Sequence, residues 1–183
     1  DCIGTAMLDN VWELTIGGAT PPFRITDLAE ECATAWTGNI ARLAVFRNNK
    51  GITAGGAGSS RSGLCTEMQF YEIAVGRIAC EPRTALFSGG ASAHNSEDDY
   101  INGMTTRWNI ELGNEITGIG LTDANDMVKT LLKNPKYKIG NEPDGMKFQE
   151  AYNLETVQPT QEYQDMYNKM TKEVRNVLGI SPK

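Results

Sequence analysis

The sequence predicts an α/β fold with a parallel sheet and more helix than strand. Two successive units each combine a short apolar run, a glycine-rich loop and an apolar helix. Such alternation favours parallel strands with helices packed against them. A closed TIM-type (β/α)8 barrel takes ~250 residues. The 183 residues could therefore supply about half of one, and we expect a single unit, residues 1–183, because no long linker divides it.

A helix, followed by the strand and loop of the first unit, is predicted upstream of residue 63. Thr26 or Asp27 can cap a helix that runs from about residue 28 towards residue 47, where apolar residues recur at helical spacing. Residues 52–57 then form a short apolar run typical of a buried strand. The loop 55–63, rich in glycine and serine, leads out of this strand.

The helix of the first unit is predicted over residues 66–80. This stretch is apolar nearly all round, which indicates a well-buried helix, and Pro82 closes it. Residues 84–87 form a second candidate strand, followed by the glycine and serine loop 88–93. The sequence therefore predicts a repeat of strand, loop and helix.

Two further helices are expected in the middle of the chain. Residues 98–118 place apolar side chains on one helical face, and Gly118 acts as a stop. Thr122 or Asp123 can cap the next helix, which ends at the pair 134–135 because the residue before a proline disfavours helix.

The clearest helix is predicted at the C-terminal end. A polar loop over 138–146 and a short helical turn over 147–154 precede it. The pair 159–160 opens it, and Gly179 is a typical helix C-terminal glycine. Its apolar face has i, i+3, i+4, i+7 spacing and consists of Tyr163, Met166, Tyr167, Met170, Val174, Val177 and Leu178.

The charge balance and the hydropathy exclude several classes of partner. The chain has 17 basic and 23 acidic residues and a net charge of -6. Nucleic acid is disfavoured because phosphate contacts need clustered Lys and Arg. No apolar run reaches the ~18 residues that a membrane helix needs, and no signal peptide opens the chain. Since the sequence begins with Asp rather than Met, it suggests a piece of a longer protein.

The cysteines do not form a metal or disulfide pattern. Four cysteines are widely spaced without a Cys-x-x-Cys pair, and the chain has one histidine. We therefore expect reduced thiols, a cytoplasmic location and no metal site within this chain.

Three residues at the start of the helix predicted over 66–80 are candidates for chemistry. Glu67 lies in the first turn, where the helix dipole stabilises a carboxylate that can bind an ammonium group, although glutamate also simply favours a helix start. The helix N-terminus could lower the pKa of the Cys65 thiol, with packing as the alternative role. Thr66 can contact substrate or only cap the helix. Glu72 fits a helix-surface charge.

A second group of candidates follows the strand 84–87. His94 lies where the carboxyl end of that strand would face a pocket, and it can carry a proton or remain a solvated loop residue. Ser88, Gly89 and Gly90 could donate backbone amides to a substrate or a cofactor tail, although a glycine loop without a GxGxxG pattern is weak evidence. Arg107 and Trp108 could form a partner-facing patch.

Several separate motifs occur in one order from about Gly63 to the C-terminus. They are Cys65-Thr-Glu-Met68, Tyr71-Glu-Ile-Ala74, Leu86-Phe-Ser-Gly-Gly-Ala-Ser-Ala93, Asn102-Gly-Met-Thr-Thr106, Gly145-Met-Lys-Phe-Gln-Glu-Ala-Tyr152 and Val157-Gln-Pro-Thr-Gln-Glu-Tyr163. With these motifs the chain, best over residues 63–183, resembles the C-terminal part of the monomethylamine:corrinoid methyltransferase family.

The resemblance implies a TIM-type barrel enzyme of which this chain is the second half. Members of that family pass a methyl group from a small methylated amine to the cobalt of a separate corrinoid protein. The corrinoid would thus be carried by a partner, with none bound by this chain alone. The expected catalytic residues are Glu67, Cys65 and His94, and the expected partners include further copies of the chain or a separate N-terminal barrel half.

Two departures from the family pattern bear on activity. The best-known members carry pyrrolysine in the first half of the barrel, which this chain lacks as written. Where the methylamine enzymes have Gln and Tyr along the substrate pocket, residues 51–63 here are mostly small. Two alternatives therefore stand beside the methyltransferase: a non-catalytic small-molecule binding homologue, and a structural half that completes a barrel with another chain.

Overall fold

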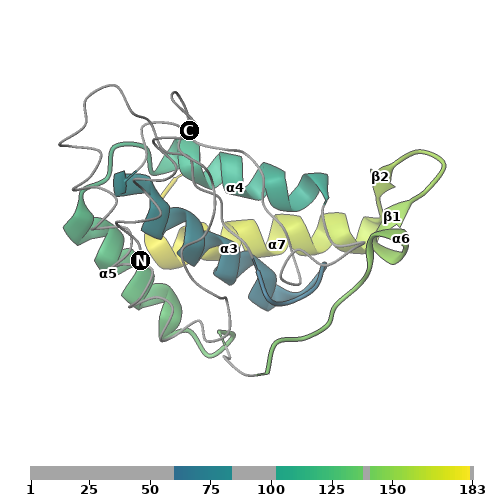
Figure 1. Cartoon of the computed structure of the whole chain (residues 1–183), viewed down its shortest axis with the longest axis horizontal. Helices are drawn as coiled ribbons and strands as arrows, with labels where there is room; N and C mark the ends of the chain where they lie inside the picture. The colour runs from purple at the N-terminus through teal and green to yellow at the C-terminus, as the bar shows by residue number, and fades with distance from the viewer. Residues whose placement is uncertain (1–59, 84–101, 138–140, 182–183) are drawn as a thin grey trace, which may run out of the picture.

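The computed structural model describes residues 60–83, 102–137 and 141–181 (Figure 1). Four main helices account for most of them. They are α3 (Glu67–Cys80), α4 (Gly103–Glu115), α5 (Leu121–Leu132) and α7 (Gln161–Leu178). A short 3₁₀ turn, η1 (Glu81–Arg83), continues α3. The helical turn α6 (Phe148–Ala151) leads into a small antiparallel hairpin of β1 (Tyr152–Asn153) and β2 (Gln158–Pro159).

Side-chain caps define the starts of three helices. Thr66 caps α3 by accepting a hydrogen bond from the backbone N–H of Gln69. Thr160 caps α7 in the same way, and Gly179 ends it in the left-handed conformation that favours glycine. Asn102 caps α4 through the backbone N–H groups of Met104 and Thr105. The predictions for Thr66, Thr160 and Gly179 are confirmed.

The helices α3, α4 and α7 run in the same direction. Early residues of each contact one another, as do late ones: Phe70 of α3 packs on Tyr167 of α7, and Glu115 of α4 binds Arg175 of α7. All three helices begin on the side of the molecule that carries the hairpin (Figure 1). Parallel neighbouring helices are expected where each is preceded by a parallel strand. The predicted strands 52–57 and 84–87 and the helix over 28–47 lie outside the described residues.

The core is centred on α3. Its side chains are buried on every face, from Met68 and Phe70 to Ile78, which confirms the prediction of a helix that is apolar nearly all round. The fully buried Trp108 and Leu112 of α4 pack against it. The predicted apolar face of α7 is also confirmed, since all seven of its residues belong to this core or pack against it.

Three local predictions were wrong. The helix predicted over 98–118 spans Gly103–Glu115, because Asn102 is extended and caps it. The N-cap of α5 is Gly120 rather than Thr122 or Asp123, so the helix begins two to three residues earlier than expected. The helical turn predicted over 147–154 is present only as α6, and the hairpin that follows it was not foreseen.

Two glycines allow the backbone of residues 63–64 to contact that of residues 143–146. Leu64 and Met146 form an antiparallel bridge with hydrogen bonds of 2.9 and 3.3 Å. A Cβ atom on Gly63 would lie 1.6 Å from the carbonyl oxygen of Asp144. Gly145 has φ +62, and a Cβ there would lie 2.5 Å from the Leu64 oxygen. Two motifs far apart in the sequence are thereby joined.

None of the helices in the described ranges is long and apolar enough to cross a membrane.

Candidate functional site

The segment from Ser60 to Glu67 forms the centre of the candidate site. It enters α3 through Cys65, which has φ +59, a left-handed backbone conformation that non-glycine residues seldom adopt. Strained positions of this kind are common at functional sites. Residues 143–146 cover the segment from one side through the Leu64–Met146 bridge.

Cys65 is buried, and the expectation of an activated thiol was wrong. Burial, with a smaller contribution from the Glu162 carboxylate, raises the pKa of the thiol to about 11. The raised pKa keeps this thiol protonated at neutral pH, because desolvation outweighs the effect of the nearby helix N-terminus. The geometry therefore favours the packing role for Cys65.

Glu67 lies at the surface between α3 and α7, about one-third exposed. Its Oε1 atom lies 2.6 Å from Lys169 Nζ and 3.4 Å from Lys136 Nζ. The hydrogen bond from Lys169 and the charge of Lys136 hold the pKa of Glu67 below its usual range, so the group is an anion at neutral pH. In the folded chain this carboxylate is therefore paired with two ammonium groups of its own chain.

The ion pairs of Glu67 continue into a wider network. Lys136 Nζ lies 2.7 and 2.8 Å from the two carboxylate oxygens of Glu173. The Tyr71 hydroxyl donates to Glu173 at 2.8 Å and accepts from the Asn134 side chain at 2.7 Å. Tyr71 lies on α3 and Glu173 on α7, so the network ties these two helices to the chain that follows α5.

Glu72 is a buried carboxylate, and the prediction of a helix-surface charge was wrong. It is 1% exposed and accepts hydrogen bonds from the backbone N–H groups of Arg61 and Ser62 at 3.2 and 3.1 Å and from the Ser62 hydroxyl. Burial nevertheless raises the pKa of Glu72 above its usual value. The apolar surroundings of its helix were the signal that could have indicated burial.

The Arg61 side chain adds a second carboxylate to this region, because its guanidinium lies 3.1 Å from Glu142. The loop that enters α3 is thus bound through its backbone by Glu72 and through the Arg61 side chain by Glu142. The remaining predicted site residues, His94, Ser88, Gly89 and Gly90, lie outside the described residues, so the structure does not place them relative to Glu67 and Cys65.

A buried polar cluster lies where α3, α4 and α7 begin. Asn102 Oδ1 accepts hydrogen bonds from the hydroxyls of Tyr152 and Tyr163 at 3.1 and 3.3 Å. Tyr152 also accepts from the Met104 backbone at 3.1 Å. Burial raises the pKa of both tyrosines, so they remain neutral donors. Residues of three quoted motifs therefore meet in one cluster.

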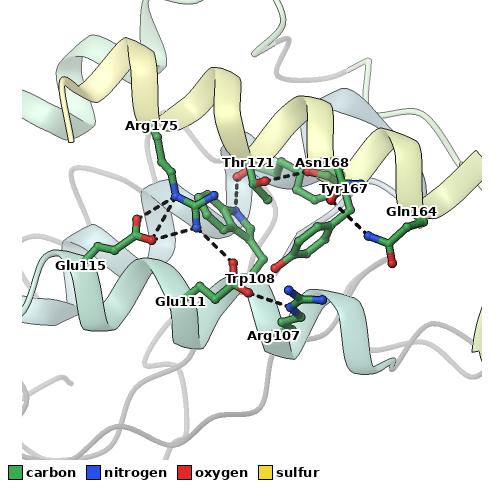
Figure 2. Close-up of polar contacts among 10 residues, drawn as sticks. Arg107, Trp108, Glu111, Glu115, Gln164, Tyr167, Asn168, Thr171 and Arg175 are labelled. Atoms are coloured by element: carbon green, nitrogen blue, oxygen red, sulfur yellow. Dashed lines mark hydrogen bonds and ion pairs between the residues drawn. The ribbon is translucent and has the colours of Figure 1, made fainter. Parts of the chain in front are cut away.

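A row of ion pairs connects α4 to α7 (Figure 2). The Arg175 guanidinium donates hydrogen bonds of 2.8 to 3.0 Å to the Glu115 carboxylate and one of 3.1 Å to Glu111. This guanidinium also lies 5.0 Å from the centre of the Trp108 ring. Because Trp108 is fully buried and donates to the Phe70 carbonyl, the expectation of a partner-facing Arg107–Trp108 patch was wrong.

Within the described ranges, no group of three or more His, Cys, Asp or Glu side chains could hold a metal ion. The chemistry available there is that of carboxylates, ammonium groups and neutral phenols. Such groups can bind and orient a charged amine and can hold its proton.

Comparison with known proteins places this chain in a family. The model of the family "Monomethylamine methyltransferase MtmB" matches residues 32–179. The chain therefore belongs to the monomethylamine methyltransferase MtmB family.

Relatives in three methanogens support the assignment. The chain is 31% identical over 120 residues to monomethylamine methyltransferase MtmB1 of Methanosarcina acetivorans, and 30% identical to MtmB1 of Methanosarcina barkeri. It is 29% identical to MtmB of Methanosarcina mazei. Each match covers 65% of this chain and 26% of the relative, so the chain spans only a fraction of their length.

Solved structures agree with this result. The crystal structure of the M. barkeri enzyme matches with a TM-score of 0.66 and 28% identity, and the match covers 79% of this chain and 32% of that one. A hydroxylamine complex of MtmB matches with a TM-score of 0.67. The fold of this chain therefore resembles about one-third of that enzyme.

Proposed function

We propose that this chain is the C-terminal part of a corrinoid-dependent methyltransferase that transfers a methyl group from a small methylated amine to the cobalt of a corrinoid protein. The family match over residues 32–179 carries the proposal. The joining of the Gly63 and Gly145 motifs by the Leu64–Met146 bridge supports it, because two segments of the resemblance meet at one place. The proposed architecture is half of a TIM-type barrel.

In this proposal the reduced corrinoid supplies the nucleophile and the protein positions the amine. The anionic Glu67 binds the alkylammonium in place of Lys169, whose side chain is 59% exposed and can move aside. Lys136 stays paired with Glu173 at 2.7 Å and keeps the site from carrying excess negative charge. Retention of the amine proton until methyl transfer makes the neutral amine the leaving group.

The other proposed site residues act beside Glu67. Thr66 keeps the start of α3 in place by accepting from Gln69 and donating to the Gly63 carbonyl at 2.9 Å. His94, Ser88, Gly89 and Gly90 are proposed to face the amine from the second glycine loop. Cys65 shapes the pocket wall as a neutral thiol.

The test is a methyl-transfer assay with isotopically labelled monomethylamine and a holo corrinoid protein in the reduced state. The purified chain is assayed alone and mixed with the separately produced N-terminal portion of an M. barkeri relative. We expect methyl-cobalt absorbance only in the mixture, because this chain matches about a quarter of a relative. A matched Glu67→Gln variant is expected to lose activity, whereas Lys169→Met, which frees Glu67, retains it.

Three other results would contradict the proposal. Amine binding without methyl transfer in any mixture would identify a binding homologue. Tight association with the N-terminal portion without amine binding would identify a structural half. Equal activity of the Glu67→Gln variant and the wild type would remove Glu67 from the site.

A further inference from the structure

The tip of the hairpin, residues 154–157, is an exposed apolar projection. Leu154 and Val157 are 61% and 60% exposed, the highest values among the large hydrophobic side chains that the structure describes. The hairpin extends away from the helices (Figure 1). A pair of apolar side chains on one small projection is typical of a protein contact rather than of isolated surface residues.

The tip is held rigidly. The Asn153 side chain accepts from the backbone N–H groups of Glu155 and Thr156 at 3.0 Å, and the Asn153 carbonyl accepts from Val157 at 2.8 Å. The base of the hairpin joins the core, because Tyr152 stacks on Phe148 at 4.5 Å. A rigid projection loses little conformational entropy on binding.

Val157 adopts a backbone conformation that its side chain disfavours. Its φ is +55, in the left-handed region, where β-branched residues are outliers. Glycine or asparagine would adopt this turn at lower cost. The strained, exposed valine has no packing role in the described part of the chain, and such strain tends to occur at functional positions.

The surroundings of the tip are acidic. Residues 147–165 carry four acidic side chains, Glu150, Glu155, Glu162 and Asp165, against Lys147, and all five are exposed. This charge repels nucleic acid and anionic lipid. It also disfavours contact with the same face of a second copy. The complementary surface is a protein with an apolar depression surrounded by Lys and Arg.

The position of the tip indicates which protein binds there. It lies on the side where α3, α4 and α7 begin, and in β/α folds this is the side where substrates bind. A protein that brings an acceptor to the substrate must approach from that side. We propose that residues 154–157 dock the corrinoid protein, an inference that rests on the proposed function.

The test measures binding of holo corrinoid protein to immobilised chain at low and high salt. We expect the double variant Leu154→Ser, Val157→Asn to bind at least about tenfold more weakly, because two apolar anchors are lost. Its Tm should be unchanged or higher, because asparagine relieves the strained turn. Loss of affinity without loss of stability separates docking from a structural role.

The matched control is Leu121→Ser. Leu121 is 41% exposed and begins α5, at the opposite end of α4 from the hairpin. This variant removes an exposed apolar side chain and is expected to leave binding unchanged. Wild-type binding should weaken as salt is raised, and Glu155→Lys should weaken it further at low salt.

Each other outcome is decisive. Equal binding by the wild type and the double variant would show that residues 154–157 do not dock the corrinoid protein. The proposed function would still stand if methyl transfer is observed. No binding by the wild-type chain would overturn the inference, and the methyl-transfer assay would then decide the proposed function separately. Tip-dependent dimerisation of the chain would identify a second copy as the occupant and overturn the inference.

Discussion

Two glutamates of α3 have opposite electrostatic environments. Glu67 is paired with Lys169 and Lys136, which lower its pKa. Glu72 is buried, and desolvation raises its pKa despite three hydrogen bonds. The difference arises because Glu67 keeps contact with solvent and cations, whereas Glu72 is desolvated, has neutral donors and feels the like charge of Glu142. The two residues should therefore respond to pH in opposite directions.

The substitution Glu72→Gln tests this difference. The folded state binds the Glu72 proton more tightly than the unfolded state, whose pKa is near 4.5. The protonated Glu72 carboxyl therefore contributes to the free energy of unfolding of the wild type below pH 4.5. This contribution is lost as the pH rises through the pKa of Glu72 in the folded state. We expect the stability of Glu72→Gln relative to wild type to increase as the pH rises, measured by urea unfolding across an acid-to-neutral series.

The control is Glu67→Gln. Because the folded pKa of Glu67 is lowered below 4.5, its contribution is present above that pH and is lost as the pH falls through the folded pKa. The relative stability of Glu67→Gln should therefore decrease as the pH rises. If the stability of both variants relative to wild type changed in the same direction with pH, the opposite environments of Glu67 and Glu72 would be contradicted.

Asn102 links a helix cap to two buried hydroxyl groups. We expect Asn102→Ala to lower the free energy of unfolding by about 2–3 kcal/mol, because it removes the cap of α4 and leaves the buried Tyr152 and Tyr163 hydroxyls without their acceptor. Asn102→Asp keeps an acceptor oxygen and should lose less. Urea unfolding measures both, and equal losses for the two variants would show that the acceptor is not the cause.

At the scale of elements, the contact between residues 63–64 and 143–146 depends on glycine. Gly63→Ala would place its Cβ 1.6 Å from the Asp144 oxygen, so the Leu64–Met146 bridge must separate. We expect a loss of about 3 kcal/mol in the free energy of unfolding. Hydrogen exchange at Leu64 and Met146 should become faster, since their hydrogen bonds are broken.

Gly103→Ala is the matched control. Gly103 is the exposed first residue of α4, and a Cβ there would have no heavy atom within 4 Å. We expect it to stabilise the chain by up to about 1 kcal/mol, because alanine favours helix. A comparable loss for both glycine variants would mean that the close backbone contact is not responsible.

The ion pair between Arg175 and Glu115 ties α7 to α4. The two side chains are 13% and 7% exposed and share several contacts (Figure 2). A double-mutant cycle with Arg175→Met and Glu115→Gln should give a coupling energy of about 1–3 kcal/mol, because the pair is shielded from solvent. The exposed pair Lys129–Asp126, at 3.9 Å, should give about 0.5 kcal/mol or less.

At the scale of the whole molecule, the proposal of a half-barrel predicts a partner. Since the chain matches about one-third of the M. barkeri structure, we expect native mass spectrometry to detect a complex between this chain and the N-terminal portion of a relative. In this proposal the sheet of a half-barrel would have unpaired edge strands, and pairing of those edges would drive the association. If the 20.0 kDa chain formed a stable assembly only with itself and did not bind the N-terminal portion, the half-barrel proposal would be contradicted.

Features that depend on neighbouring residues could be predicted from the sequence. The apolar periodicity of residues 161–178 predicted α7 and its buried face, and Thr66, Thr160 and Gly179 were foreseen as helix ends. Caps and helical faces depend on side chains three or four residues apart, so a local pattern is sufficient to predict them. The order of the family motifs also indicated the family.

The pairing of residues that are distant in the sequence depended on the folded core. Folding paired Glu67 with Lys169 and Lys136 with Glu173, and it joined Leu64 to Met146. Each of these contacts brings together groups whose separation in the sequence leaves no periodic signal. The raised pKa of Cys65 has the same origin, because burial is a property of the assembled core and outweighs the local effect of the helix N-terminus.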